Sequence, residues 1–366
     1  MNPGELELAA AIAATLRESW RATGSPFVPA TDLPTREWTQ RLIEGGVGGL
    51  AWWRIRGTAL ADDPGVSDLH AAFRHHAVHA VRQERDLEHV LLHFNDAGLE
   101  PIVFKGWALS RLYPHRALRP FGDFDLLVQQ AEVERARTVL RALRSSLQER
   151  ADVDTAATLR RYLPDRIEAE LWARSRPEQL GRARFRVLAD EDHLRLVALH
   201  QLHHGGYRPL WLCDLAVLVE SLPEDFDWGR CLAGDRWLSE GVGAALGLAA
   251  ELLGARLPPG APVVAPPGWL REAVLRGWVR GYDSMPPPLY ELHTLGFRGA
   301  MRAMRARWPD PVSATVHLRA PFRWIPRVLV QSAEVLRRAF DFVRRDVRWR
   351  VGIDAQLANV GKGVVP

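Results

Sequence analysis

The sequence predicts an α+β protein with a small sheet at about residues 96–189, between an N-terminal helical segment (1–95) and a larger C-terminal helical domain (190–366). Two observations predict this class. Short apolar runs typical of strands lie in the middle of the chain, and the flanking regions carry apolar residues at helical spacing. The 366 residues, 47% hydrophobic and 25% charged, suit a globular protein of two or three domains.

Composition excludes several classes of protein. Cys213 and Cys231 form no C-x-x-C pattern, so neither a zinc site nor a disulfide framework is indicated. The first apolar run follows acidic residues rather than basic ones, which disfavours a signal peptide, and no apolar run is long enough for a membrane span. We therefore expect a cytoplasmic protein without a membrane partner, whose net charge of +4 is compatible with an anionic partner.

The N-terminal segment is predicted to be helical. Glu5–Arg21 has apolar residues at helical spacing, and Thr35–Ile43 and Leu50–Ile55 suggest two shorter helices. A long amphipathic helix is predicted over Ser67–Phe94, with a stop signal at Asn95–Gly98.

The central stretch from Pro101 to Val128 reads PIVFKGWALSRLYPHRALRPFGDFDLLV and requires a chemical explanation. A strand-like run ends at Lys105-Gly106, where the backbone can turn and approach phosphate oxygens. A second run carries Asp123 and Asp125, which share one face of a strand. One or two carboxylates are how proteins usually hold Mg²⁺ on substrate phosphates, so the stretch suggests phosphoryl or nucleotidyl transfer. The alternative is that the two aspartates edge a surface strand.

Lysine usage supports the chemical interpretation. The chain has 48 lysines and arginines, of which only Lys105 and Lys362 are lysines. A compact ammonium at the turn is therefore a specific choice, because lysine and arginine differ in how they meet a phosphate.

The motifs F-K-G-x-A-L and R-P-x-G-D-x-D-L-L-V, joined by the Tyr113-Pro114 turn, resemble the uncharacterised nucleotidyltransferase family of the polymerase-β-like superfamily. The resemblance implies a small mixed sheet, Mg²⁺ (or Mn²⁺) as cofactor, and an NTP such as ATP as co-substrate. It assigns Asp123 and Asp125 to the metal. The phosphates would be contacted by four residues: Lys105, Gly106, Arg119 and Gly122.

Two features depart from the commoner superfamily pattern. Trp107 follows Gly106 where serine is usual, and the spacing from Gly106 to Asp123 is long. The resemblance implies that the family accommodates both departures, and the absent serine concerns the contacts to the γ-phosphate.

A third carboxylate is expected from the resemblance, as a metal ligand or as the base for the acceptor hydroxyl. The sequence offers Ile167–Leu171 as a third strand, after a helix over Glu132–Leu147. Glu170 is the first choice and Glu168 the second, and the alternative is a surface strand. The histidine that the family often has after this point is missing, and Trp172 follows at once.

The C-terminal domain begins with a predicted helix capped by Asp190. His200 and His204 share a face of this helix, and Asp214 lies within the next apolar helix. These three residues are interpreted as a buried polar network or as contacts on the acceptor side, and not as a zinc peptidase motif, because no H-E-x-x-H order is present.

Beyond Trp228 the pattern is weaker. Helices are expected over Gly241–Leu257 and Trp269–Val279, joined by a proline-rich connector. Arginines interleaved with tryptophans, such as Trp324 and Trp349, could contact nucleic acid or could line a solvated helix.

The resemblance thus implies a Mg²⁺-dependent enzyme that moves an NMP from NTP to a hydroxyl of a small molecule, peptide or protein and releases pyrophosphate. Two alternatives remain open: a toxin-like transferase that modifies RNA such as tRNA, and a catalytically degenerate module that binds nucleotide. The acceptor cannot be inferred from the sequence, because the appended helices build its binding site.

Overall fold

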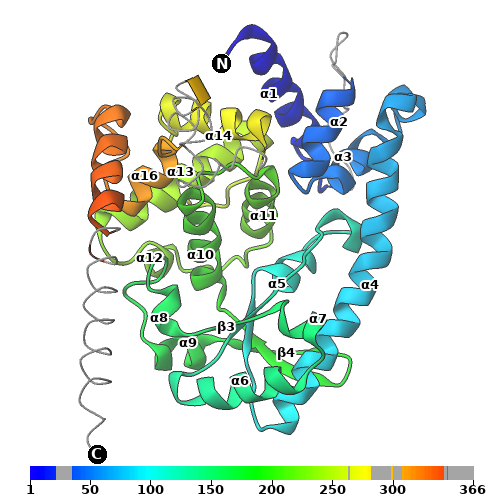
Figure 1. The fold of residues 1–366 in the computed structure, drawn as a ribbon, viewed down its shortest axis with the longest axis vertical. Helices are drawn as coiled ribbons and strands as arrows, with labels where there is room; N and C mark the ends of the chain where they lie inside the picture. Colours follow the sequence, from blue (N-terminus) through cyan, green and yellow to red (C-terminus); the bar gives the residue numbers. More distant parts are fainter. Residues whose placement is uncertain (22–34, 263, 282–297, 300–306, 342–343, 345–366) are drawn as a thin grey trace, which may run out of the picture. The chain divides into compact units, whose positions relative to one another are not determined.

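A computed structural model of the protein describes residues 1–21, 35–262, 264–281, 298–299, 307–341 and 344. The chain divides into two compact units, Met1–Ser284 and Met285–Pro366. The first unit holds a five-stranded mixed sheet with helices before and after it (Figure 1), so the predicted α+β class is confirmed. Among the described residues, no helix has both the length and the apolar character to cross a membrane.

Three short helices open the chain, and each lies close to its predicted position: α1 (Pro3–Leu16), α2 (Thr35–Glu44) and α3 (Gly48–Ile55). A capping box fixes the start of α1: the Glu5 amide donates to Asn2 Oδ1 at 2.8 Å, and the Asn2 amide donates to Glu5 Oε2 at 2.9 Å. Two 3-10 turns precede the fourth helix, η1 (Ala59–Asp62) and η2 (Pro64–Val66).

Helix α4 (Ser67–Asp96) supports the sheet. Its buried residues recur every three or four positions, as Leu87, Val90, Leu91 and Phe94 do, so one stripe faces the core. The helix ends before Gly98, whose φ of +71° suits glycine, and this confirms the predicted stop signal.

The sheet has the strand order β3-β2-β1-β5-β4. The central pair β1–β2 and the pair β4–β5 are antiparallel, whereas β1–β5 and β2–β3 are parallel. The strands are β1 (Ile102–Phe104), β2 (Phe124–Leu127), β3 (Ala151–Asp154), β4 (Arg176–Leu180) and β5 (Ala183–Val187).

The two faces of the sheet differ in chemistry because side chains alternate along a strand. One face carries Val103, Phe124 and Phe185, which are buried together with the apolar stripe of α4. Asp125 alternates with these residues, since it follows Phe124 and is the register partner of Phe104. The opposite face therefore presents carboxylates.

The prediction of a strand at Ile167–Leu171 is wrong. These residues belong to the start of helix α9 (Glu168–Arg174). Ile167 is 64% exposed and only Leu171 is buried, so the segment lacks the apolar face that a paired strand needs. Two glutamates in the first turn also favour a helix, because its N-terminus is electropositive.

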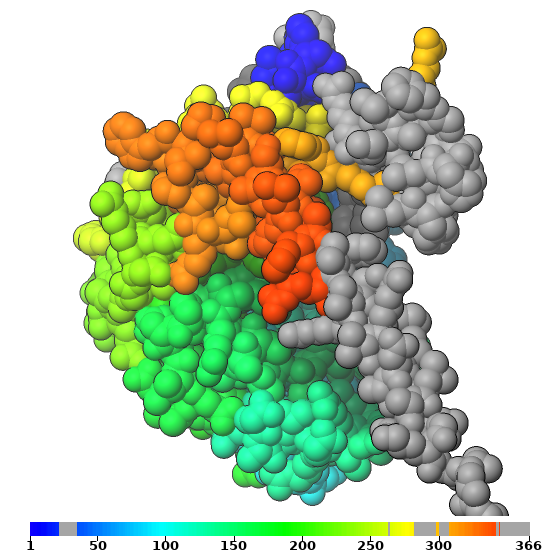
Figure 2. Space-filling model, turned by 60° about the vertical axis from the view of Figure 1, so that its left-hand side comes forward, coloured from blue at the N-terminus to red at the C-terminus, as the bar shows by residue number. Residues whose placement is uncertain are grey.

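The other helices around the sheet are short. The predicted helix over Glu132–Leu147 is interrupted, since its middle adopts an extended conformation at Leu143. α6, α8 and α9 contribute to the surface of this unit, in blue-green and green in Figure 2. The elements are α5 (Gly106–Ser110), η3 (Arg116–Leu118), η4 (Gln130–Glu132), α6 (Val133–Ala142), α7 (Ser145–Gln148) and α8 (Ala156–Leu159).

Helices α10 (Asp190–His203), α11 (Pro209–Glu220) and α13 (Arg236–Leu253) pack against one another. Most residues of α10 and α11 are buried. This is expected for α11, which is apolar on nearly all sides, whereas α10 also buries polar residues such as Asp192 and Arg195. The predicted capping role of Asp190 is wrong: Ala189 is the N-cap, and Asp190 pairs with Arg176. The described part of this unit also contains α12 (Trp228–Cys231) and α14 (Gly268–Arg280).

In the second unit, α16 (Pro311–His317) begins at Asp310, whose carboxylate accepts from the amides of Val312 and Ser313 at 2.9 Å. Arg337 and Arg338 both pair with the buried carboxylate of Glu334. These arginines of the predicted basic segment thus serve the packing of their own unit. Trp349, and residues 301–306 of the same arginine-rich region, lie outside the described residues.

Candidate functional site

The Lys105-Gly106 turn and the aspartate strand meet at the carboxylate face of the sheet. Lys105 Nζ lies 2.8 Å from Asp125 Oδ1, and both side chains are about one-fifth exposed. A Cβ on Gly106 would lie 3.1 Å from the Asp123 carbonyl oxygen, so a side chain there would crowd the strand. The structure therefore brings together the four residues of the central motif.

The backbone of Lys105 is held in an unusual conformation. Its φ is +54° with ψ at −135°, a region that costs a non-glycine residue roughly 1–3 kcal/mol and that is concentrated at functional sites. The Lys105 amide donates to Nε2 of His193 at 3.4 Å. Burial lowers the pKa of His193 to about 3, so the imidazole is neutral and its Nε2 can accept.

A further carboxylate, Asp152 on β3, lies beside the motif. Asp152 is the register partner of Asp125 on the adjacent parallel strand, so both side chains lie on the same face. Partial burial raises the pKa of Asp152, and the charges of Asp125, Asp123 and Asp154 raise it further. The positive charge of Lys105 opposes this shift.

This cluster suits a divalent cation. Like charges gathered beside an apolar sheet are unfavourable unless a cation joins them. Within the described part of the chain, no three Asp, Glu, His or Cys side chains converge as a complete metal site. Mg²⁺ needs no such cage, because it usually takes one or two carboxylates and fills its remaining positions with water and substrate phosphates. The residues present therefore fit Mg²⁺ bound together with a nucleotide.

The charge repulsion has a measurable consequence: Asp152→Asn should raise the melting temperature of the metal-free protein at about pH 7. The pKa of Asp152 is raised in the folded chain from 3.8, so its ionisation opposes folding. The penalty is complete above the folded-state pKa and absent below the unfolded-state pKa, so the gain should vanish by about pH 3.

Thermal unfolding across this pH range measures the effect. The exposed Glu134→Gln is the control, since Glu134 is 79% exposed and pairs only with its helix neighbour Arg137 among the described residues. An Asp152→Asn variant that melts below the unmodified protein at about pH 7 would refute the repulsion.

Arg119 is engaged by Asp214. Its Nε and Nη2 donate to Asp214 Oδ1 and Oδ2 at 3.1 and 2.9 Å, and Tyr113 Oη donates to Asp214 Oδ1 at 2.9 Å. Burial lowers the pKa of Arg119, but the charge and hydrogen bonds of Asp214 reverse this, and the net pKa is raised. Asp214 is thus part of a buried polar network that ties the loop before Asp123 to α11.

Gly122 lies in an open position. A Cβ there would meet nothing within 4 Å, and its carbonyl accepts from Arg150 Nε at 2.8 Å. Arg150 also pairs with Asp86 on α4, at 2.8 Å. These contacts fix the loop that leads into Asp123.

Glu168 and Glu170 lie on α9. Glu168 Oε2 accepts from the Gln130 amide at 2.8 Å, and Glu170 Oε2 lies 3.8 Å from Arg230 Nη2. Neither glutamate is among the charges that shift the pKa of Asp152, whereas Asp123, Asp125 and Asp154 are. The structure therefore brings the β3 carboxylates to the motif, and Asp152 is the one in register with Asp125.

His200 borders the same site from α10. Its Nδ1 is 3.2 Å from Tyr162 Oη, and its ring lies 4.6 Å from that of His204 and 5.2 Å from that of Trp211. Burial lowers the pKa of His200 to about 2, and the next cause is the charge of Lys105. Burial likewise raises the pKa of Tyr162 to about 12. The structure thus brings a largely buried aromatic and histidine cluster near Lys105.

Asp152 and Tyr162 were missed at the level of sequence. Asp152 lies in Ala151–Asp154, which repeats the D-x-D alternation of β2, and this pattern could have drawn attention to it. Tyr162 lies in no recognisable motif.

Comparison with known proteins gives one match. The sequence model of a family described as "Uncharacterised nucleotidyltransferase" matches residues 34–254, which is more than half of the chain and includes the whole sheet and α10 to α13. No curated protein and no solved structure matches the chain.

Proposed function

Because this chain belongs to the uncharacterised nucleotidyltransferase family, and is therefore an enzyme of the transferase class, we propose that it moves an NMP from an NTP to a hydroxyl acceptor and releases pyrophosphate. The observation that carries this proposal is the contact of Lys105 with Asp125 at 2.8 Å, on the face where Asp152 is the register partner of Asp125. Phosphate-side and metal-side groups thus share one small site.

The residues of the turn bind the triphosphate. Lys105 carries the positive charge that neutralises phosphate oxygens, and Gly106 leaves room for them beside the Asp123 backbone. Mg²⁺, held by Asp123 and Asp125, would supply charge neutralisation of the triphosphate. Gly122 directly precedes Asp123 and so flanks the proposed metal site. Arg119 acts indirectly, because Asp214 holds its guanidinium and together they position the loop before Asp123.

The acceptor oxygen forms a bond to the α-phosphorus while the bond to the pyrophosphate oxygen breaks. The hydroxyl proton passes to a carboxylate oxygen, and we assign this role to Asp152 in place of Glu170 or Glu168. Its raised pKa makes Asp152 a better proton acceptor than an ordinary aspartate. Most of the rate enhancement then comes from positioning and charge neutralisation.

The acceptor approaches from the side of α10. His200, His204 and Trp211 give this side aromatic surface, and Tyr162 links His200 to the carboxylates electrostatically. A small molecule, a peptide or a protein side chain could supply the hydroxyl. The pairing of Arg337 and Arg338 with Glu334 gives no support to the alternative acceptor, RNA.

The assignment of the third carboxylate can be tested by comparing Asp152→Asn with Glu170→Gln. Asp152→Asn should lower the rate of transfer by about a hundredfold or more, within the usual range for loss of a general base, whereas Glu170→Gln should change it by less than about threefold. Labelled NTP incubated with small-molecule, protein and RNA pools identifies an acceptor, and pyrophosphate release then gives the rates. A large loss in Glu170→Gln with full activity in Asp152→Asn would reverse the assignment.

A further inference from the structure

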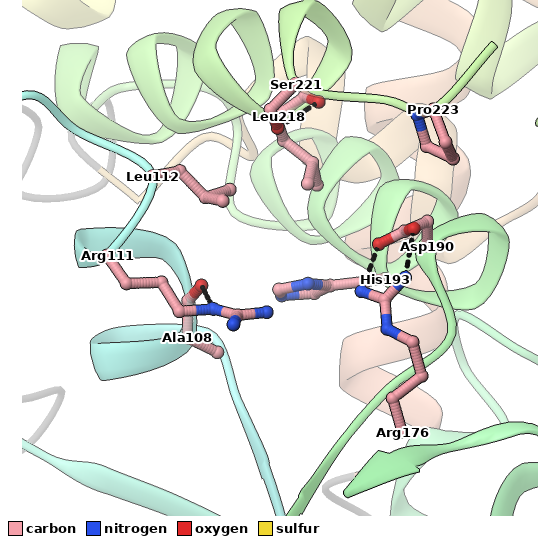
Figure 3. A pocket seen from close by; sticks show the side chains of 9 residues that line it. All are labelled: Ala108, Arg111, Leu112, Arg176, Asp190, His193, Leu218, Ser221 and Pro223. Atoms are coloured by element: carbon pink, nitrogen blue, oxygen red, sulfur yellow. Dashed lines mark hydrogen bonds and ion pairs between the residues drawn. The ribbon is translucent and has the colours of Figure 1, made fainter. Parts of the chain in front are cut away.

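A cavity lies beside helix α5, away from the residues of the carboxylate face. It has a volume of about 260 Å³, opens partly to solvent, and is lined by residues of α5, β4, the start of α10 and the end of α11 (Figure 3). None of the residues of the proposed transfer site lines it. Its apolar part is formed by Ala108, Leu112, Leu218 and Pro223.

Two guanidinium groups enter this cavity from different elements. Arg111 projects from the end of α5 toward the ring of His193, and Arg176 rises from β4 to Asp190 (Figure 3). The charges of Arg111 and Arg176 both act to lower the pKa of His193, so both lie close enough to affect the charge of its ring. Asp190 also lines the cavity, and its charge acts on the His193 pKa in the opposite direction. The polar end of the cavity therefore holds two guanidinium groups and one carboxylate around a neutral imidazole.

Both arginines keep donors for a ligand. Arg111 uses Nε for the Ala108 carbonyl and Nη1 for Glu178, and Arg176 uses its two Nη atoms for Asp190. A guanidinium has five N–H donors. Among the described residues, no partner is found for Arg111 Nη2 or for Arg176 Nε. A small anion could accept from both side chains while their ion pairs persist.

We propose that this cavity is a second binding site for a small carboxylate- or phosphate-bearing molecule with a short apolar body, held by Arg111, Arg176 and His193. The anionic group binds the guanidinium groups, and the apolar body rests on Leu112 and Leu218. The site itself does not depend on the proposed transfer reaction.

The cavity is connected to the transfer site through one side chain. His193 is 5% exposed, lines the cavity, and accepts the Lys105 amide hydrogen at Nε2. A ligand that shifts the imidazole therefore alters the hydrogen bond that holds the Lys105 backbone at φ +54°. Occupation of the cavity changes nucleotide affinity, and this second part of the inference rests on the proposed function.

The site can be tested with malonate and inorganic phosphate as probes on protein carrying ¹³C-labelled histidine. Malonate should shift the His193 ring resonance saturably, with the resonance assigned by its loss in His193→Gln. Arg111→Gln and Arg176→Gln should each weaken malonate binding by about tenfold, as expected for loss of a charge-assisted hydrogen bond. Both side chains are partly exposed, at 30% and 47%, so the variants should fold.

Two controls separate this site from the proposed transfer site. Arg137→Gln removes an exposed arginine that is likewise paired with a glutamate, and it should leave malonate binding unchanged. Lys105→Ala should also leave malonate binding unchanged while weakening nucleotide binding. The proposed binding site would be refuted if malonate caused no saturable shift of the His193 resonance. It would also be refuted if both cavity variants bound malonate as tightly as the unmodified protein. Malonate binding without any change in nucleotide affinity would overturn the coupling alone.

Discussion

Asp125→Asn is expected to reduce nucleotide transfer by about a thousandfold or more, and Asp123→Asn by a similar factor, because each removes a charge proposed to hold Mg²⁺ on the triphosphate. Asparagine keeps the size of the side chain and can still accept a hydrogen bond from Lys105 Nζ, which lies 2.8 Å from Asp125 Oδ1. The variants should therefore fold while losing Mg²⁺-dependent activity. Pyrophosphate release, measured as Mg²⁺ is varied, gives the effect.

Glu134→Gln on α6 is the matched control, since it removes a carboxylate that is 79% exposed and pairs with Arg137. Its activity should equal that of the unmodified protein. Full activity in both Asp123→Asn and Asp125→Asn would show that the carboxylate face is not the transfer site.

Asp214→Ala is expected to destabilise the protein by about 3–5 kcal/mol, because it leaves the Arg119 guanidinium buried without its counter-ion. The two side chains are 8% and 2% exposed, so solvent cannot replace the lost partner. Tyr113 Oη also loses its acceptor in the buried network. For a unit of 284 residues the melting temperature should fall by about 5–8 °C.

The double variant Arg119→Met with Asp214→Leu distinguishes the cost of leaving Arg119 buried and unpaired from the effect of removing the whole ion pair. It removes both charges, so it should be more stable than Asp214→Ala alone. Chemical denaturation of both variants measures their free energies of unfolding. The exposed Glu134→Ala is the control, and it should change the free energy of unfolding by less than about 0.5 kcal/mol. Equal stability of Asp214→Ala and the unmodified protein would show that the ion pair contributes nothing.

The fold was predictable where local signals agree. The apolar stripe of α4, the Gly98 stop and the strands at Ile102–Phe104 and Phe124–Leu127 follow from periodicity and turn chemistry. The error at Ile167–Leu171 arose because an alternation of five residues fits a strand and a helix start equally well. Which side chains of this segment are buried distinguishes the strand from the helix, and that burial depends on the rest of the fold.

The candidate site likewise has one part that could be predicted from local sequence and another that depends on the fold. Lys105, Gly106, Asp123 and Asp125 lie within one short stretch, so their chemistry was visible in the sequence. Asp152 becomes their neighbour only through the parallel pairing of β2 with β3, and no local pattern specifies which strands pair. The Arg119–Asp214 pair spans 95 positions, so the partner that takes Arg119 away from direct phosphate contact could not be read from the motif.

The most direct test of the central claim is a crystal structure of the protein with Mg²⁺ and a non-hydrolysable NTP analogue. We predict that the metal lies between Asp123 and Asp125, that the triphosphate contacts Lys105 at the Gly106 turn, and that Asp152 faces the α-phosphate. A nucleotide bound away from this face of the sheet, or a metal held by Glu168 or Glu170 instead, would contradict the account.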